Sequence, residues 1–352
     1  MIVQSGARAP RLAAMITAGI IGGSGFAGSE VLRLAASHPE IRVAWATGDS
    51  MAGTPIAELV PSLAAAHPSD VFLSYDPALL EGVDVVFLGL PHGASQSLVP
   101  ELFGKVRWII DLAADFRHRD PSIYDDWYGE PHAAPHLLER FVYGLPELYR
   151  DQIKAADCVA APGCYPTSAN LVLAPLVRAG VIDPSHVIVD SACGVSGAGR
   201  PAKPNTTFCA VDENLSAYGL LDHRHTPEME THSGATVLFT PHLAPMNRGI
   251  LSTCYGRVLG EHTTESALEV LSDAYADEPF VVVSERSPQT KACQGSNTAH
   301  LTVRVDHRTG TVVALAAIDN LVKGTAGQAI QCLNLMAGLP ETTGLPLVGT
   351  MP

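Results

Sequence analysis

The sequence predicts an α/β protein: an N-terminal doubly wound parallel sheet of the Rossmann type, joined to an α+β domain with a largely antiparallel sheet. In the first half of the chain, apolar strand-like runs alternate with helical stretches, as in βαβ units. The second half contains short β-rich runs separated by turns. The length of 352 residues suggests two domains, at roughly 150 residues per domain.

The elements of the first half follow from the placement of apolar residues. An apolar, partly β-branched run at residues 14–21 stops at a glycine cluster, so it predicts a buried strand. Apolar residues at helical spacing predict a helix at residues 30–37. We expect further strands at residues 41–46, 83–90 and 106–112, and a buried helix at residues 167–179.

The second half predicts a mainly antiparallel sheet. We expect its strands at residues 187–189, 236–239, 251–257, 280–283, 300–305 and 311–318, with a hairpin turn at residues 306–310. A final helix at residues 328–336 should pack back on the first domain. The expected division is therefore a loose tail at residues 1–14, a first domain of residues 15–163 and about 320–352, and a second domain of residues 164–319.

Composition excludes several classes of protein. Apolar residues make up 47% and charged residues 16%, which excludes an intrinsically disordered chain. The net charge of −14 disfavours nucleic acid or an anionic membrane as a partner, and an anionic substrate would need a local cluster of positive charge. The seven cysteines show no C-x-x-C spacing, which argues against a disulfide framework or a four-cysteine zinc site. We expect a cytoplasmic protein.

A glycine-rich segment, GGSGFAG, follows the first predicted strand and contains the pattern G-x-G-x-x-G. The strand-to-helix context is the one in which this pattern binds a dinucleotide, because glycines admit the pyrophosphate and the helix N-terminus offers free N–H groups. An ordinary glycine-rich turn is the alternative. The expected cofactor contacts are Gly22, Gly23, Ser24, Gly25, Phe26, Ala27 and Gly28.

The ends of the next two predicted strands refine the cofactor site. After residues 41–46, Thr47 and Ser50 offer hydroxyl groups where an NAD-selective protein usually has an acid, which suits a 2′-phosphate. Asp49 argues the other way, because a carboxylate facing the phosphate would repel it, and a plain polar loop is the alternative. The next strand ends in a tight bend, at the edge where ligands bind in open α/β sheets. The expected cofactor contacts there are Leu90, Pro91 and His92, although a plain loop role is the preferred interpretation of His92.

The segment APGCYPT carries the sharpest chemical signal. Cys164 lies between a Pro-Gly turn and a predicted helix start. The helix dipole stabilises a thiolate there and lowers its pKa, so Cys164 is a candidate nucleophile. A buried structural cysteine is the alternative, and it is the role we expect for the other six.

A nucleophilic thiol needs a base, and HRHTPE is the densest candidate segment. His223 and His225 would point to one face of an extended segment that enters a helix. We expect His225 to be the base and His223 to lie closer to the substrate. A zinc site that includes Glu228 or His232 and a merely structural pair are the alternatives.

Two arginines could receive an anionic substrate. Arg117 follows a predicted strand, and Arg200 ends the glycine-rich stretch SGAGR, in which Ser196 and Gly197 could help form an anion-binding nest and Gly199 could approach the cofactor. Solvated surface arginines are the alternative.

Together these stretches resemble the N-acetyl-γ-glutamyl-phosphate reductases of arginine biosynthesis. The matching stretches run in order from about residue 15 to 340 and are GIIGGSGFAG, LGLPHGAS, DLAADFR, VYGLPEL, APGCYPTSANL, SGAGR, HRHTPE and DNLVKGTAGQAIQ. Aspartate-semialdehyde dehydrogenases share the architecture, but PGCYPT and HRHTPE resemble the reductase.

The resemblance implies an NADP-binding Rossmann domain, a catalytic and oligomerisation domain, and a homodimer or homotetramer with a small-molecule substrate. It implies reduction of an acyl phosphate to a semialdehyde through a thioester on Cys164, with Asn320 and Lys323 near the nicotinamide. We expect no metal. Asp49 stands where many members have an arginine. Another acyl-phosphate reductase, such as an aspartate-semialdehyde dehydrogenase, and a non-catalytic NADP-binding sensor remain the alternatives.

Overall fold

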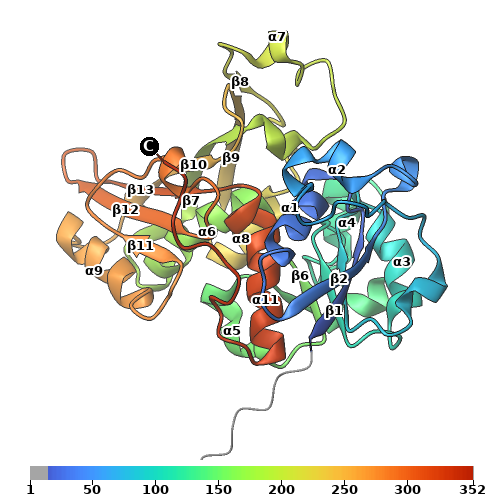
Figure 1. The fold of residues 1–352 in the computed structure, drawn as a ribbon. Helices are drawn as coiled ribbons and strands as arrows, with labels where there is room; N and C mark the ends of the chain where they lie inside the picture. Colours follow the sequence, from blue (N-terminus) through green and yellow to red (C-terminus); the bar gives the residue numbers. More distant parts are fainter. Residues whose placement is uncertain (1–14, 352) are drawn as a thin grey trace, which may run out of the picture.

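The structure, a computed structural model, describes residues 15–351, so the expected tail at residues 1–14 lies outside the described residues. Two sheets form its framework. A six-stranded sheet has the order β2-β1-β3-β4-β6-β5, and a seven-stranded sheet has the order β11-β12-β13-β10-β7-β9-β8. Figure 1 shows them side by side, with the C-terminal helix α11 between them.

Every strand pair of the six-stranded sheet is parallel. Its strands are β1 (Ile16–Ile21), β2 (Ile41–Ala46), β3 (Val85–Leu88), β4 (Trp108–Asp111), β5 (Phe141–Tyr143) and β6 (Cys158–Ala160). The four strands predicted in this region are confirmed, most of them shorter than expected. The sequence analysis missed β5 and β6, because three residues are too few to show a period.

Helices cover both faces of this sheet, as the apolar strands require. They are α1 (Phe26–Ala35), α2 (Ile56–Leu59), α3 (Ala94–Leu102), α4 (Ser122–Tyr128) and α5 (Pro146–Lys154). Helix α1 begins at Phe26, earlier than the expected residue 30, directly after the glycine segment. Ile330 and Leu333 of α11 (Gly327–Ala337) belong to the same hydrophobic core as Ile20 and Phe87 of the sheet.

The seven-stranded sheet is mostly antiparallel, as predicted, with two parallel pairs, β7–β9 and β11–β12. Its strands are β7 (Ile182–Gly194), β8 (Ser216–Ala217), β9 (Val237–Ala244), β10 (Ile250–Val258), β11 (Val281–Val283), β12 (Ala299–Asp306) and β13 (Thr311–Ile318). The predicted hairpin joins β12 to β13. The run expected at residues 187–189 is the middle of the much longer β7.

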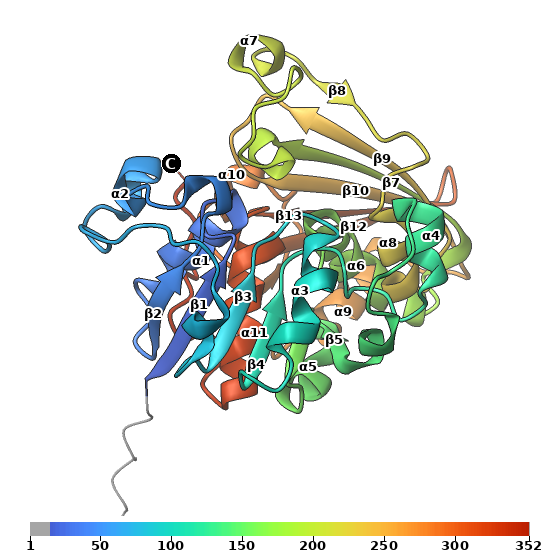
Figure 2. The same cartoon turned by 90° about the vertical axis from the view of Figure 1, so that its right-hand side faces the viewer.

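Helix α6 (Cys164–Arg178) packs on one face of the seven-stranded sheet, and its Leu171 and Leu176 share a core with Val189 and Ala314. The remaining helices are α7 (Phe208–Val211), α8 (Thr226–Ser233), α9 (Thr264–Ala274) and α10 (Thr290–Cys293), and a π-helical turn (Val322–Ala326) precedes α11. Figure 2 shows the projecting segment, which carries α7 and extends beyond the edge of the seven-stranded sheet that β8 forms.

Candidate active site

Cys164 is the first residue of α6, immediately after the turn that follows β6. Gly163 is the N-cap, and no side chain caps this helix end, so the first-turn N–H groups are not used by a cap. Cys164 is half-buried, whereas five of the other six cysteines are buried as expected. Cys209 departs from that expectation, because it lies exposed on α7.

Glycines on two sides of Cys164 allow other segments of the chain to pack closely around it. A Cβ on Gly163 would lie 2.5 Å from Nε2 of His225, and a Cβ on Gly324 would lie 2.9 Å from the Cβ of Cys164. Either contact is too short for a real side chain. These glycines therefore let His225 and the π-helical turn approach the thiol from opposite segments of the chain.

The surroundings of Cys164 favour its thiolate. Hydrogen bonding with the Cys193 thiol lowers the pKa of Cys164 most, and the charge of Arg117 and the backbone N–H of Tyr165 act in the same direction. Together they outweigh the desolvation of the thiolate, so the pKa lies below the ordinary value for a cysteine. The same pairing raises the pKa of Cys193 well above its ordinary value, so Cys164 ionises first.

A buried carboxylate anchors the Cys164 turn. Oε1 of Glu228, on α8, accepts the backbone N–H of Gly163 at 2.7 Å and the hydroxyl of Tyr143 at 2.8 Å. Oε2 pairs with Nη1 of Arg117 at 3.3 Å. Arg117 also donates to the carbonyls of Ala161 and Leu112, at 2.9 and 3.2 Å. The network ties the turn before Cys164 to the helix that follows His225.

The two histidines lie together, with ring centroids 4.8 Å apart. Nδ1 of His223 accepts the backbone N–H of His225 at 3.2 Å, which leaves the proton of the neutral ring on Nε2. Nε2 of His225 lies 3.4 Å from Nη1 of Arg117 and accepts from it. Burial is the main cause that lowers the pKa of His223 to about 4 and the pKa of His225 well below its ordinary value, so both rings are neutral near pH 7.

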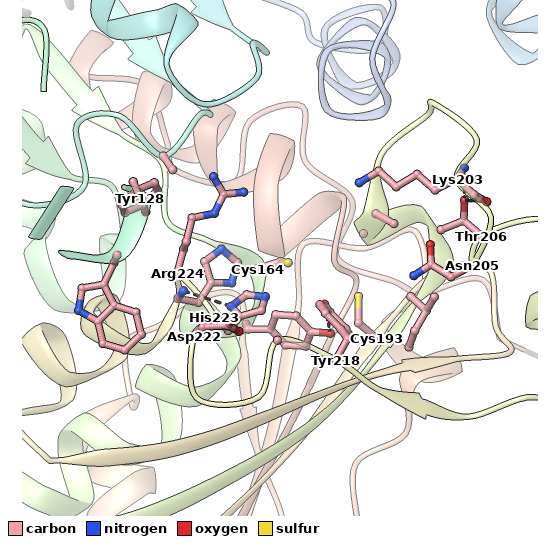
Figure 3. A pocket seen from close by; sticks show the side chains of 18 residues that line it. Tyr128, Cys164, Cys193, Lys203, Asn205, Thr206, Tyr218, Asp222, His223 and Arg224 are labelled. Carbon is pink, nitrogen blue, oxygen red and sulfur yellow. Dashed lines mark hydrogen bonds between the residues drawn. The ribbon is translucent and has the colours of Figure 1, made fainter. Parts of the chain in front are cut away.

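A cavity of about 680 Å³ opens beside Cys164. His223, His225, Cys193 and Gly197 line it. Figure 3 shows Cys164 between His223 and Arg224 on one side and Lys203, Asn205 and Thr206 on the other. Its position next to the thiol makes it the candidate substrate cavity.

A second cavity, of about 940 Å³, shares Cys164 and Gly197 with the first. It lies over the carboxyl ends of the parallel strands, where ligands bind in open α/β sheets. The expected residues that line it are Gly22, Ser24, Gly25, Phe26, Ala27, Thr47, Ser50, Leu90, Pro91, Ser196, Gly197, Gly199, Arg200 and Asn320.

The glycine segment fits a dinucleotide. A Cβ on Gly22 would meet the carbonyl oxygen of Gly89 at 2.4 Å, and one on Gly28 would meet the carbonyl oxygen of Gly22 at 2.3 Å, so packing requires both glycines. Gly25 has room for a Cβ, so the protein itself does not require glycine there. The open space over the uncapped start of α1 suits a pyrophosphate. Gly23 and Gly28 support this loop from outside the cavity lining.

Five more expected contacts lie elsewhere, and one of them is Ser196, which lines the cofactor cavity and not the substrate cavity. Arg117 is absent from the substrate cavity because its buried side chain is held by Glu228 and two carbonyls. Arg200 lines the cofactor cavity instead, where it donates to the carbonyl of Ser24 and lies 4.6 Å over the Phe26 ring.

His92 and Lys323 are engaged with acids and line neither of these two cavities. Nδ1 of His92 lies 2.5 Å from Asp115. Nζ of Lys323 is fully buried and lies 2.5 Å from Glu147. The sequence could not reveal these partners, because Glu147 is 176 residues from Lys323.

Several residues that line the substrate cavity were not expected from the sequence. They include Trp127, Tyr128, Cys193, Lys203, Asn205, Thr206, Tyr218 and Arg224. Arg224 stands inside HRHTPE, so its position between two chemically important histidines was an available signal. The others lie in segments without a motif.

Within residues 15–351, no group of three or more His, Cys, Asp or Glu side chains is arranged to hold a metal ion. In the same range, no helix is both long enough and apolar enough to cross a membrane.

Two family models match the chain. The NAD binding domain of semialdehyde dehydrogenases matches residues 17–156, and their dimerisation domain matches residues 164–320. The chain is 45% identical over 348 residues to an N-acetyl-gamma-glutamyl-phosphate reductase from Geobacter sulfurreducens, covering 96% of this chain and 100% of that protein. It is 46% identical over 339 residues to the same reductase from Symbiobacterium thermophilum, covering 94% and 97%.

Solved structures show the same fold. Aspartate semialdehyde dehydrogenase with NADP from Candida albicans has a TM-score of 0.68 at 15% identity, covering 92% of this chain and 98% of that one. Aspartate semialdehyde dehydrogenase II from Vibrio cholerae has a TM-score of 0.65 at 16% identity, covering 93% and 99%. The predicted fold class is confirmed.

Proposed function

The chain belongs to the N-acetyl-gamma-glutamyl-phosphate reductase family, and on that premise we propose how it performs the reaction of that family. The enzyme reduces N-acetyl-γ-glutamyl phosphate to N-acetylglutamate γ-semialdehyde and releases phosphate, in arginine biosynthesis. The observation that carries the proposal is the position of Cys164, which lines both the substrate cavity and the cofactor cavity. Its surroundings also lower the pKa of its thiol.

The reaction begins on Cys164. Its Sγ attacks the acyl carbon, the bond from that carbon to the phosphate oxygen breaks, and a thioester remains on the enzyme. Nearby first-turn N–H groups of α6 stabilise the oxyanion that forms on the way. NADPH, when bound, supplies the hydride that reduces the thioester carbonyl. The hemithioacetal on Cys164 then collapses, the C–S bond breaks and the aldehyde leaves.

The histidines manage the protons of these steps. The neutral ring of His225 lies next to the Cys164 turn, and its Nε2 gives up the 3.4 Å contact with Arg117 to take the Sγ proton and later return it to the departing sulfur. His223 lines the cavity with its proton on Nε2, so it donates to the carbonyl oxygen of the substrate. This supports the expected division, with His225 as the base and His223 closer to the substrate.

NADP(H) fits the larger cavity. The N–H groups at the start of α1 would hold the pyrophosphate, and the hydroxyls of Thr47 and Ser50 would face the 2′-phosphate. Asp49 stands in the same loop, with a φ of +46°, and lines the cofactor cavity. Its carboxylate limits the preference for NADPH over NADH. Asn320, held by Ser196 at 3.0 Å, would lie by the nicotinamide. We assign the cofactor domain to residues 15–163 and about 320–352, and the catalytic domain to residues 164–319.

An assay in the oxidising direction tests the proposal. The protein should reduce NADP⁺ with N-acetylglutamate γ-semialdehyde only when inorganic phosphate is present. Aspartate semialdehyde, the substrate of the structural neighbours by their names, serves as the control and should give a far lower kcat/KM. A higher kcat/KM with aspartate semialdehyde, or no activity with either aldehyde, would refute the proposed function.

We also propose that the chain works as a homodimer or homotetramer in the cytoplasm. The dimerisation-domain match and the apolar side chains of the projecting segment support an assembly. Phe208 is 78% exposed, and Leu220 and Leu221 are 61% and 76% exposed. Light scattering coupled to size exclusion should give a multiple of 37.1 kDa, and the Phe208→Ser/Leu221→Ser variant should shift toward the monomer. A monomeric wild type would contradict the assembly.

A further inference from the structure

Two cations at the substrate cavity take no part in the proton and hydride transfers proposed above. Among residues 15–351, Lys203 and Arg224 are the only lysine and arginine that line this cavity. Lys203 lies in the loop after Gly199, and Arg224 lies between the catalytic histidines. Figure 3 shows them on opposite sides of Cys164.

Neither cation is paired with an acid within the described residues. In residues 15–351, no hydrogen bond or ion pair within 4.0 Å involves Nζ of Lys203 or the guanidinium of Arg224, which lies 5.2 Å over the Tyr128 ring. By contrast, Arg117, Arg150 and Arg248 pair with acids. Acids outnumber basic residues by 36 to 22, so two unpaired cations beside a nucleophile indicate sites for an anion.

The two sites offer different donors. Asn205 and Thr206 line the cavity beside Lys203, and the Thr206 hydroxyl holds the Lys203 backbone N–H at 2.9 Å. A compact ammonium with amide and hydroxyl groups around it suits a tetrahedral phosphate. Arg224 presents a planar fork that matches a carboxylate. Asp222 also lines the cavity and opposes anion binding, but it pairs with neither cation within 4.0 Å.

The substrate of the proposed function carries two anionic groups. The phosphate is bonded to the carbon that Cys164 attacks, and the α-carboxylate lies at the other end of the glutamyl chain. With the reacting carbon at Sγ, the two charges extend in opposite directions. That arrangement matches cations on both sides of the thiol.

We propose that Lys203, with Asn205 and Thr206, binds the phosphate group, and that Arg224 binds the α-carboxylate. This inference rests on the proposed function. Lys203 and Arg224 take the role that was expected of Arg117 and Arg200, because both of those arginines are bound to other groups of the protein. Lys203 neutralises the charge of the leaving phosphate, and Arg224 selects a substrate with a free carboxylate.

The oxidising direction separates the two sites, because phosphate and semialdehyde then bind as separate substrates with one anionic group each. Lys203→Met should raise KM for phosphate by about 10- to 100-fold and leave KM for the semialdehyde within about twofold. Arg224→Gln should do the reverse. Lys203→Arg should recover most phosphate binding, whereas Arg224→Lys should recover little, because the planar fork is lost.

Matched surface variants control for the loss of charge. Lys105→Met and Arg308→Gln remove exposed cations that line neither cavity and should leave both KM values unchanged. A second readout needs no turnover: inorganic phosphate should slow iodoacetamide alkylation of Cys164 in the wild type and in Arg224→Gln, but not in Lys203→Met.

The outcomes are distinct. Exchanged effects, equal effects on both KM values, or no effect in either variant would overturn the inference. A wild type with no phosphate-dependent activity would refute the proposed function instead, without regard to either variant.

Discussion

Replacing Glu228 with glutamine removes the charge at the centre of the buried network while keeping the size of the side chain. The amide oxygen can still accept from Gly163 and Tyr143, as Oε1 does at 2.7 and 2.8 Å. The amide nitrogen, however, would face Nη1 of Arg117, which lies 3.3 Å from Oε2. A donor would then face a donor, and the guanidinium would lose its carboxylate partner.

The cost follows from burial. The Glu228 side chain is fully buried and the Arg117 side chain is 7% exposed. Breaking a buried ion pair by neutralising one partner costs about 3–5 kcal/mol. Arg117 keeps its bonds to the Ala161 and Leu112 carbonyls, so we expect about 3 kcal/mol, the lower end of that range. Glu228→Ala would lose all three contacts and cost more.

Urea denaturation measures this cost, and Glu230→Gln is the matched control on the same helix. Glu230 is only partly buried and accepts the Val237 N–H at 2.9 Å, a bond that glutamine keeps, so its cost should stay below about 1 kcal/mol. In a double-mutant cycle, Arg117→Met should cost less in the Glu228→Gln background than in the wild type.

A second measurement distinguishes this network from simple packing. The Glu228 carboxylate raises the pKa of Cys164, so Glu228→Gln should move the midpoint of the pH profile of Cys164 alkylation to lower pH. Loss of packing alone would not produce that shift. Unchanged stability, or a midpoint that moves to higher pH, would be inconsistent with an ion pair between Glu228 and Arg117 beside Cys164.

Three further predictions follow from the same structure. Cys193→Ala removes the largest cause of the lowered Cys164 pKa, so the midpoint of the alkylation profile should rise toward the ordinary value of 9.0; an unchanged midpoint would count against the pairing. Ser50→Ala should lower kcat/KM for NADPH by about tenfold, one charged hydrogen bond, and Asp49→Arg should raise it, with NADH little changed in either case; equal changes for both cofactors would show that this loop does not face the 2′-phosphate. Burial lowers the pKa of His118 from 6.5 to about 4, so the folded state binds fewer protons than the unfolded state and stability is lost as pH falls from 6.5 toward 4. His118→Phe loses no hydrogen bond of the ring within the described residues, so its Tm should fall less over that pH range. An acid dependence of Tm identical to that of the wild type would contradict this.

Local patterns predicted the elements that are long and strongly periodic. The strand at residues 41–46 has the expected bounds, and the hairpin that ends at β13 has the expected turn. The glycine segment and APGCYPT also indicated a cofactor loop and a reactive cysteine, because a strand-to-helix turn is encoded by neighbouring residues. The very short β5 and β6 carried no such pattern.

Pairings between distant residues could not be predicted. Arg117 follows a strand as expected, but its acidic partner Glu228 lies 111 residues further along the chain. Without that partner in view, a cation at a strand end suggests substrate binding. The same holds for Lys323, whose buried partner Glu147 only the fold brings near. The local sequence marks which side chains can react, and tertiary packing decides which of them reach the cavity.

Formation of a thioester on Cys164 can be followed in a burst experiment. The enzyme is mixed with N-acetylglutamate γ-semialdehyde and NADP⁺ without phosphate, and NADPH formation is followed together with the mass of the Cys164 peptide. Oxidation of the hemithioacetal should give one rapid burst of NADPH, stoichiometric with the chains, and an N-acetylglutamyl adduct on Cys164. Added phosphate should then release the adduct and start steady turnover. A burst that persists in Cys164→Ser, or an adduct on any other residue, would show that Cys164 does not carry the thioester.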